Sequence, residues 1–154
     1  MVRAQAQILV GLPPEPVFGF VAEDFVRNYP RWSPEVQRLE LLTPGPLRVG
    51  SRARQFRVDQ GRRSDSTFRV VVLEPPSRVG FSEVSERFRI EYRLEALGER
   101  TRLSFAFELR QLDFYMRPFE KLIRAAVQEG AERVVRNIKG LVEREVAPTL
   151  KPNN

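Results

Sequence analysis

The chain has 154 residues, of which 42% are hydrophobic and 30% are charged. This length and composition are typical of one globular domain with its own core. Cysteine and histidine are both absent. Their absence excludes disulfide bonds, thiolate zinc sites, and the triad hydrolases and metal enzymes that depend on histidine. We expect no metal and no cofactor.

The formal net charge is +6, and arginine supplies most of the cations, with 23 Arg against three Lys. A basic protein can bind nucleic acid or an anionic membrane. The arginines run from Arg3 to Arg144 and mostly alternate with apolar residues, so we expect solvated strand faces and no nucleic-acid partner. No apolar run reaches the roughly 18 residues of a membrane span. Residues 1–7 lack the apolar core of a signal peptide, so we expect a cytoplasmic protein without stable membrane insertion.

The N-terminal part of the chain predicts one strand followed by two short helices. Residues 2–10 alternate weakly between apolar and polar side chains, as in a strand. Pro14 or Pro16 suits the first turn of a helix. A second short helix is predicted over residues 24–29. Two prolines bracket Trp32, which predicts a loop or turn at this tryptophan.

The middle of the chain predicts six strands joined by short turns. Their ranges are 36–43, 49–58, 64–73, 78–85, 87–95 and 102–109. In the fifth of these ranges the apolar residues Phe88, Ile90, Tyr92 and Leu94 alternate with charged residues, which indicates a half-buried strand. Short turns between consecutive strands predict an antiparallel meander with one apolar, aromatic face.

The last long segment, residues 113–145, predicts a helix of roughly nine turns. Pro118 marks either its true first turn or a kink. Apolar residues recur along it at steps of three and four, and we expect this stripe to lie on the apolar face of the sheet. The stripe consists of Phe119, Leu122, Ile123, Ala126, Gly130, Val134, Ile138 and Leu141.

These elements predict an α+β fold in which a strongly curved antiparallel sheet of seven strands wraps around a long C-terminal helix. Two short helices lie between the first and second strands. We expect a single domain over residues 1–147 and a flexible C-terminal tail over residues 148–154.

Five stretches punctuate this order of elements, at residues 13–21, 29–36, 44–51, 72–79 and 137–143. With them the chain resembles the START-like helix-grip superfamily, also called SRPBCC, and its polyketide cyclase/dehydrase group. The resemblance covers residues 2 to about 145. It implies a cavity between sheet and helix that holds a hydrophobic small molecule. It also implies either a lipid or quinone carrier or an enzyme of the cyclase or dehydratase type.

Candidate cavity residues come from the apolar face of the sheet and from the long helix, because small-molecule pockets are mostly apolar. The sheet candidates are Phe68, Val70, Phe81, Ile90, Tyr92, Phe105 and Phe107. The helix candidates are Tyr115, Phe119, Leu122, Ile123 and Ala126. Trp32 either lines the cavity or plugs the space under the short helices. The alternative for the whole set is a close-packed core without a cavity.

A few charged residues are candidates for polar roles. Arg52, Arg54 and Arg57 lie on the one strand without clean alternation, so at least one could point inward and bind a carboxylate or phosphate. The alternative is a solvated strand that protects the sheet edge. Glu83 or Glu86, if buried, could act as a general base.

Three functions remain open from the sequence. The first is a cytoplasmic carrier or binding protein for a hydrophobic small molecule or lipid. The second is a cyclase or dehydratase acting on an aromatic or polyketide-like substrate. The third is a ribosome-associated or protein-interaction module, which a basic outer sheet face would support. The oligomeric state is open. We expect the short helices to lie under the C-terminal half of the long helix and the cavity to lie against its N-terminal half.

Overall fold

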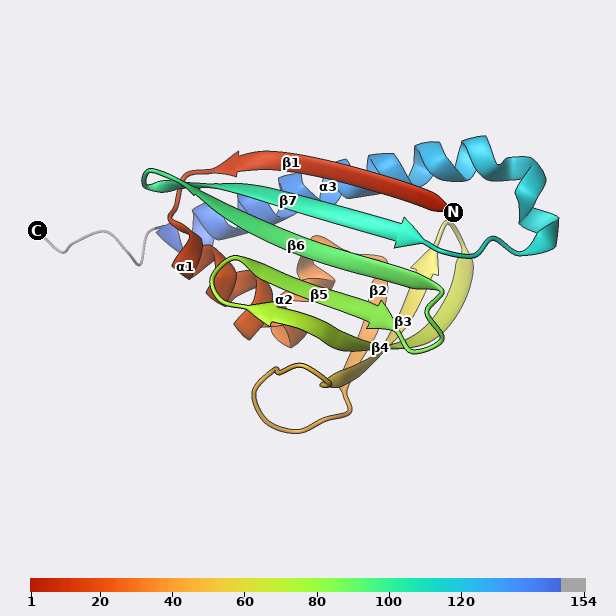
Figure 1. The fold of residues 1–154 in the computed structure, drawn as a ribbon, viewed down its shortest axis with the longest axis horizontal. Helices are drawn as coiled ribbons and strands as arrows, with labels where there is room; N and C mark the ends of the chain where they lie inside the picture. Colours follow the sequence, from red (N-terminus) through yellow and green to blue (C-terminus); the bar gives the residue numbers. More distant parts are fainter. Residues whose placement is uncertain (148–154) are drawn as a thin grey trace, which may run out of the picture.

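A computed structural model describes residues 1–147 of the chain; the predicted tail, residues 148–154, lies outside the described residues. One curved sheet forms the body of the molecule, and a long helix lies along it (Figure 1). Its strands are β1 (Val2–Val10), β2 (Val36–Leu41), β3 (Arg52–Asp59), β4 (Arg62–Glu74), β5 (Arg78–Glu83), β6 (Phe88–Leu97) and β7 (Arg100–Leu109). Their order across the sheet is β1-β7-β6-β5-β4-β3-β2, and every neighbouring pair is antiparallel. The predicted meander is confirmed.

The register of the strands gives the sheet one apolar face and one charged face. Tyr92 of β6 pairs with Phe105 of β7, and Phe105 pairs with Ala6 of β1. Cross-strand partners lie on the same face because side chains alternate along each strand. The neighbouring residues Glu91 and Arg93 therefore project from the opposite, outer face.

Three short helical segments connect β1 to β2. They are α1 (Pro14–Phe18), a π-helical turn η1 (Gly19–Glu23) and α2 (Phe25–Trp32). The loop predicted at Trp32 is wrong, since α2 continues through Pro30 to this residue. Phe25, Tyr29 and Trp32 recur at helical spacing and are all buried. Burial of this aromatic side outweighs the backbone hydrogen bond that Pro30 cannot donate.

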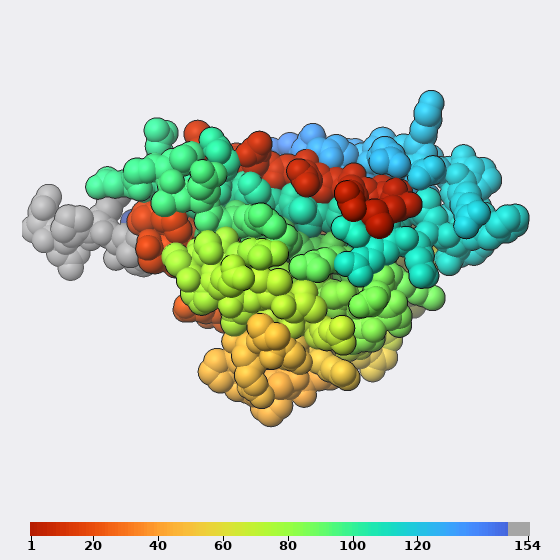
Figure 2. Space-filling model, in the orientation of Figure 1, coloured from red at the N-terminus to blue at the C-terminus, as the bar shows by residue number. Residues whose placement is uncertain are grey.

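The C-terminal part of the chain begins with a 3₁₀ turn, η2 (Phe114–Phe119), followed by α3 (Glu120–Glu145). The predicted single helix from residue 113 is therefore interrupted. Pro118 lies at the junction, where its missing N–H and fixed φ angle are tolerated. One end of the molecule, on the right in Figures 1 and 2, is formed by η2 and by the segment that joins β7 to η2.

The predicted apolar stripe on the long helix is correct only in part. The buried residues of α3 are Ala131, Val135, Ile138 and Val142. Leu122 and Ala126 are exposed. From Leu122 through Ala126 to Ile138, one row of the predicted stripe advances by four residues at a time, and each such step exceeds the 3.6-residue turn by about 40°. It therefore winds around the helix and joins the core only near Ile138.

The C-terminal half of α3 is held by β1 and by α2. Asn137 Nδ2 donates to the main-chain oxygen of Trp32 at 3.0 Å, and Arg31 of α2 forms an ion pair with Glu145. Ile138 and Val142 are completely buried. The short helices therefore brace the C-terminal half of α3, as the sequence predicts.

Candidate functional site

Most of the predicted cavity residues on the sheet are buried, and Phe68, Phe81 and Tyr92 contact aromatic side chains of α2. The buried members are Phe68, Val70, Phe81, Ile90, Tyr92 and Phe105. Phe25 of α2 stacks on Phe81 with ring centroids 4.3 Å apart and meets Phe68 edge-on at 6.0 Å. Sequence reasoning missed Phe25. A helical period that places Phe25, Tyr29 and Trp32 on one side was the signal that could have found it.

Trp32 closes this aromatic cluster from the end of α2. It is 1% exposed and lies edge-on to Tyr92 at 5.8 Å between ring centroids. Its indole Nε1 donates to the Tyr92 hydroxyl at 3.2 Å. Burial raises the pKa of Tyr92 above its ordinary value, so this phenol stays protonated and neutral.

A second set of polar groups lies on the concave side of β3 and β4. The Tyr29 hydroxyl donates to Gln55 Oε1 at 2.8 Å, and Gln55 Nε2 donates to Ser66 Oγ at 3.1 Å. Arg57 donates to the same Tyr29 oxygen at 2.9 Å and binds Asp59 through two further nitrogens. Burial raises the pKa of Tyr29 despite the nearby guanidinium. We call Tyr29, Gln55, Arg57 and Ser66 the polar cluster.

The structure shows which of Arg52, Arg54 and Arg57 points inward, a question that the sequence left open. Arg57 reaches the interior, where Tyr29 and Asp59 outweigh the cost of its burial and raise its pKa. Arg52 and Arg54 are exposed on the outer face. Arg57 therefore satisfies the hypothesis of one inward arginine, although Asp59 already balances its charge.

The two candidate general bases have structural roles. Glu83 is buried, and its carboxylate accepts hydrogen bonds from the main-chain N–H groups of Ser85 and Arg87 at 2.7 and 3.2 Å. These bonds hold the turn between β5 and β6. Glu86 is exposed in this turn and lies 3.9 Å from Arg110.

Two further predicted residues, Phe107 on β7 and Ile123 on α3, lie close to η2 in the chain, at the open end of the concave face. Phe107 is half-buried and stacks on Phe88 at 6.2 Å, with 20° between the rings. Ile123 and Val127 on α3 are also half-buried. We call these four residues the open-end surface. Sequence reasoning named Phe107 and Ile123 and missed the other two.

The position of Gln128 places Val127 beside this end of the sheet. Gln128 bonds to the backbone of Gln5, whose neighbour Ala4 pairs with Phe107. Val127 and Phe107 both pack against the main core from opposite elements. The open-end surface is therefore apolar, is contributed by sheet and helix together, and is not fully covered.

The other helix candidates are more exposed than the open-end surface. Tyr115 is 63% exposed, Phe119 55% and Leu122 71%, and Ala126 is exposed as well. The sequence predicts a ligand-binding role for Trp32, the seven sheet candidates and the five helix candidates. This role stays a prediction.

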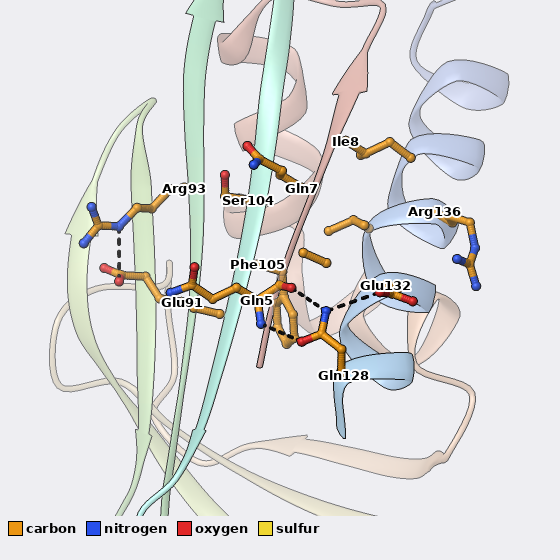
Figure 3. Close-up of a pocket in the computed structure, with 13 residues that line it drawn as sticks. Gln5, Gln7, Ile8, Glu91, Arg93, Ser104, Phe105, Gln128, Glu132 and Arg136 are labelled. Atoms are coloured by element: carbon orange, nitrogen blue, oxygen red, sulfur yellow. Dashed lines mark hydrogen bonds and ion pairs between the residues drawn. The ribbon is translucent and has the colours of Figure 1, made fainter. Parts of the chain in front are cut away.

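An open groove of about 910 Å³ lies between β1 and α3 and extends over the outer side of β7 and β6 (Figure 3). Four of its polar side chains are paired with one another. Gln128 joins the backbone of Gln5 to Glu132, and Arg93 pairs with Glu91. Phe105 is the one member of the predicted cavity set that lines it. The groove therefore has both polar and apolar walls, and none of the four residues of the open-end surface lines it.

Within residues 1–147, no group of three or more acidic, histidine or cysteine side chains is arranged to hold a metal ion. The same residues contain no helix whose length and apolar character would let it cross a bilayer.

A curved sheet that grips a C-terminal helix, with helical segments between its first two strands, defines a helix-grip protein. The family model described as polyketide cyclase / dehydrase and lipid transport matches residues 1–143. The chain belongs to this family. No curated protein matches the sequence.

Solved structures with this fold include both enzymes and START proteins. Zhui aromatase/cyclase from Streptomyces sp. R1128 is 18% identical, with a TM-score of 0.78 over 97% of this chain and 98% of that chain. A START superfamily protein from Mycobacterium smegmatis is 16% identical, with a TM-score of 0.70 over 92% and 97% of the two chains. The di-domain ARO/CYC BexL is 24% identical, with a TM-score of 0.73 over 97% of this chain and 49% of that chain. At these identities the likeness shows the fold and leaves the choice between binding and catalysis open.

Proposed function

We propose that this protein binds a hydrophobic small molecule or lipid, and that the ligand lies on the open-end surface. The observation that carries this proposal is the stacked pair Phe88 and Phe107, which is half-buried on the concave face beside the buried residues Ile90 and Phe105. Ile123 and Val127 supply an apolar counterpart on α3. An apolar ligand placed between them would remove this surface from water, which is favourable in proportion to the area buried.

The polar groups of the interior support binding more than chemistry. Among the described residues, no buried side-chain nitrogen or oxygen lacks a hydrogen-bond partner. Glu83, Trp32 and Tyr92 are all engaged with other groups of the protein. A binding protein needs no unengaged acid or base, whereas general acid–base catalysis does.

The proposal is tested by titrating fatty acids, quinones and flat polyaromatic compounds while following thermal unfolding and native mass. A ligand at roughly 100 times its dissociation constant adds about 2.7 kcal/mol to the free energy of unfolding. Trp32 emission is a secondary readout, because this residue is buried under α2 and reports on the interior. No change in melting temperature or in bound mass with any of these ligand classes contradicts the proposal.

Paired variants separate ligand contacts from core packing. Ile123→Ala is expected to weaken ligand binding roughly tenfold, because the lost side chain covers apolar surface. Its effect on the free energy of unfolding is expected to be small, since Ile123 is only half-buried. Ile138→Ala, at a completely buried position of the same helix, is the matched control. It is expected to cost about 2–5 kcal/mol of stability and to leave ligand affinity unchanged. Equal stability losses with unchanged binding in both variants would mean that no ligand lies beneath α3.

A second candidate function is a cyclase or dehydratase acting on an aromatic substrate, and the polar cluster favours it. The Tyr29 hydroxyl is held between Gln55 and Arg57, and its raised pKa keeps it protonated at neutral pH, as a general acid must be. Turnover of an aromatic polyketide precursor by the wild type, lost in Tyr29→Phe while the fold is retained, would establish the enzyme. Ligand binding without turnover would leave the carrier.

A further inference from the structure

A short stretch at the start of α3 exposes four large hydrophobic side chains. Phe114 is 84% exposed, and Tyr115, Phe119 and Leu122 are each more than half exposed. They lie within nine consecutive residues, on η2 and the first turn of α3. This segment occupies the end of the molecule opposite the C-terminal end of α3 (Figures 1 and 2). We call residues 110–124 the tip.

The exposed side chain of Leu122 in the tip does not face the concave side of the sheet. Leu122 shares a helix side with Ala126, Glu129 and Arg133, all of which are exposed. That side is opposite the one that buries Ala131, Val135, Ile138 and Val142. The Leu122 side chain therefore points away from the sheet and into the solvent.

The apolar residues of the tip are interspersed with cations. Its four cations are Arg110, Arg117, Lys121 and Arg124, against two acids, Asp113 and Glu120. Arg110 binds Glu108 and Arg124 binds Glu120. The side chains of Arg117 and Lys121 are exposed and make no hydrogen bond or ion pair with another residue of the described chain.

We propose that the tip docks reversibly on the surface of an anionic lipid bilayer. Aromatic and leucine side chains combined with lysine and arginine are the composition of interfacial segments. Arg117 and Lys121 supply the charge that complements anionic headgroups. A second copy of the chain fits less well, because a symmetric contact would bring these uncompensated cations together without a counterion. Docking would also bring the open-end surface, which adjoins η2, close to the bilayer.

The proposal does not depend on the ligand proposed above. It is tested by flotation with vesicles of phosphatidylcholine alone and of phosphatidylcholine mixed with phosphatidylglycerol. The wild type is expected to float with the anionic vesicles and much less with the neutral ones. The double variant Phe114→Ser/Leu122→Ser is expected to bind the anionic vesicles at least about tenfold more weakly. Leu9→Ser is the matched control, because Leu9 is an exposed hydrophobic residue on β1 remote from the tip. It is expected to bind like the wild type.

A second double variant tests how much the positive charge of the tip contributes to membrane binding. Arg117→Gln/Lys121→Gln is expected to weaken binding to anionic vesicles several-fold and to leave binding to neutral vesicles unchanged. Raised salt is expected to reproduce this loss in the wild type. No binding of the wild type to anionic vesicles, or equal binding by the wild type and the Phe114/Leu122 variant, overturns the proposal.

Two further measurements keep this proposal apart from its alternatives. A wild-type dimer that dissociates in the Phe114/Leu122 variant without any vesicle binding would assign the tip to a second copy and overturn membrane docking. Ile123→Ala is expected to retain vesicle binding, and the Phe114/Leu122 variant to retain ligand binding in vesicle-free solution. Failure of membrane docking is therefore distinguishable from failure of ligand binding.

Discussion

At the residue scale, the hydrogen bond between Trp32 and Tyr92 ties α2 to the sheet. Tyr92→Phe removes the acceptor and leaves the indole Nε1 of Trp32 buried without a partner. An unsatisfied buried donor costs about 1–3 kcal/mol. We expect the variant to lose this much free energy of unfolding at neutral pH, as measured by denaturant titration, while its secondary structure is unchanged.

The same substitution changes the pH dependence of stability. Burial raises the pKa of Tyr92 above its ordinary value of 10.0. Above pH 10 the unfolded chain loses the phenolic proton while the folded chain keeps it, so the stability falls as the pH rises. Below pH 10 both states keep the proton, and this contribution is fully present. The Tyr92→Phe variant is expected to lose less stability as the pH rises above 10. Burial also raises the pKa of Tyr29, so Tyr29 contributes to the alkaline loss of stability that remains. An unchanged alkaline slope would contradict this prediction.

At the element scale, α3 protects the free edge of the sheet at β1. Gln128 accepts from the Gln5 N–H at 3.2 Å and donates to the Gln5 carbonyl at 2.8 Å. Lys139 Nζ donates to the carbonyl oxygen of Leu9 at 2.8 Å. An unpaired strand edge is a site for pairing with other chains, and coverage by a helix is one way to block it.

We expect Gln128→Ala to speed amide hydrogen exchange at Gln5 and to cost about 1 kcal/mol. The amide of Ala6 is the internal reference, because alternate residues of an edge strand direct their backbone groups toward the neighbouring strand, here β7. Faster exchange at Ala6 to the same degree as at Gln5 would indicate general loosening of β1 and not a lost edge contact.

At the scale of the whole molecule, the excess of basic residues behind the net charge of +6 is spread along the chain. About half of the arginine and lysine side chains within residues 1–147 form ion pairs. On the outer face of β2 and β3, Arg38 and Arg54 lie over the ring of Phe56 at 5.8 and 4.7 Å. They also form ion pairs with Glu40 and Asp65. This face combines arginines with an aromatic ring, the composition that a nucleic-acid or ribosome-binding module would use, but acids neutralise the two arginines nearest the ring.

We therefore expect any binding to single-stranded RNA to be weak and to disappear at physiological salt. Backbone contacts release counterions, so their strength falls steeply with ionic strength. Fluorescence anisotropy of a labelled RNA at low and physiological salt checks this. Arg52→Gln/Arg69→Gln, which removes a cross-strand pair of arginines from this region, is the variant that should abolish the residual low-salt binding. Tight binding that persists at physiological salt would favour the interaction module over the carrier.

The elements of this fold were largely predictable because their signals are local. Alternation of apolar and charged residues defines β6, and short turns between strands define the meander. The buried spacing around Ile138 also matched a helical period. Errors occurred at Trp32 and Leu122. At both positions the local pattern was compatible with two environments, and contacts made by distant elements selected one of them.

The sequence by itself determined the α+β class, the order of the elements and, through the absence of cysteine and histidine, which chemistries this protein lacks. Only the tertiary structure decided that α2 fills the interior with Phe25 and Trp32, that Arg57 is the inward arginine, and that Leu122 faces outward. The physical reason is that period and propensity are properties of neighbouring residues, whereas burial depends on which surfaces meet in space. A phenylalanine on a predicted apolar face has the same local sequence signal whether another side chain, a ligand or a membrane covers it.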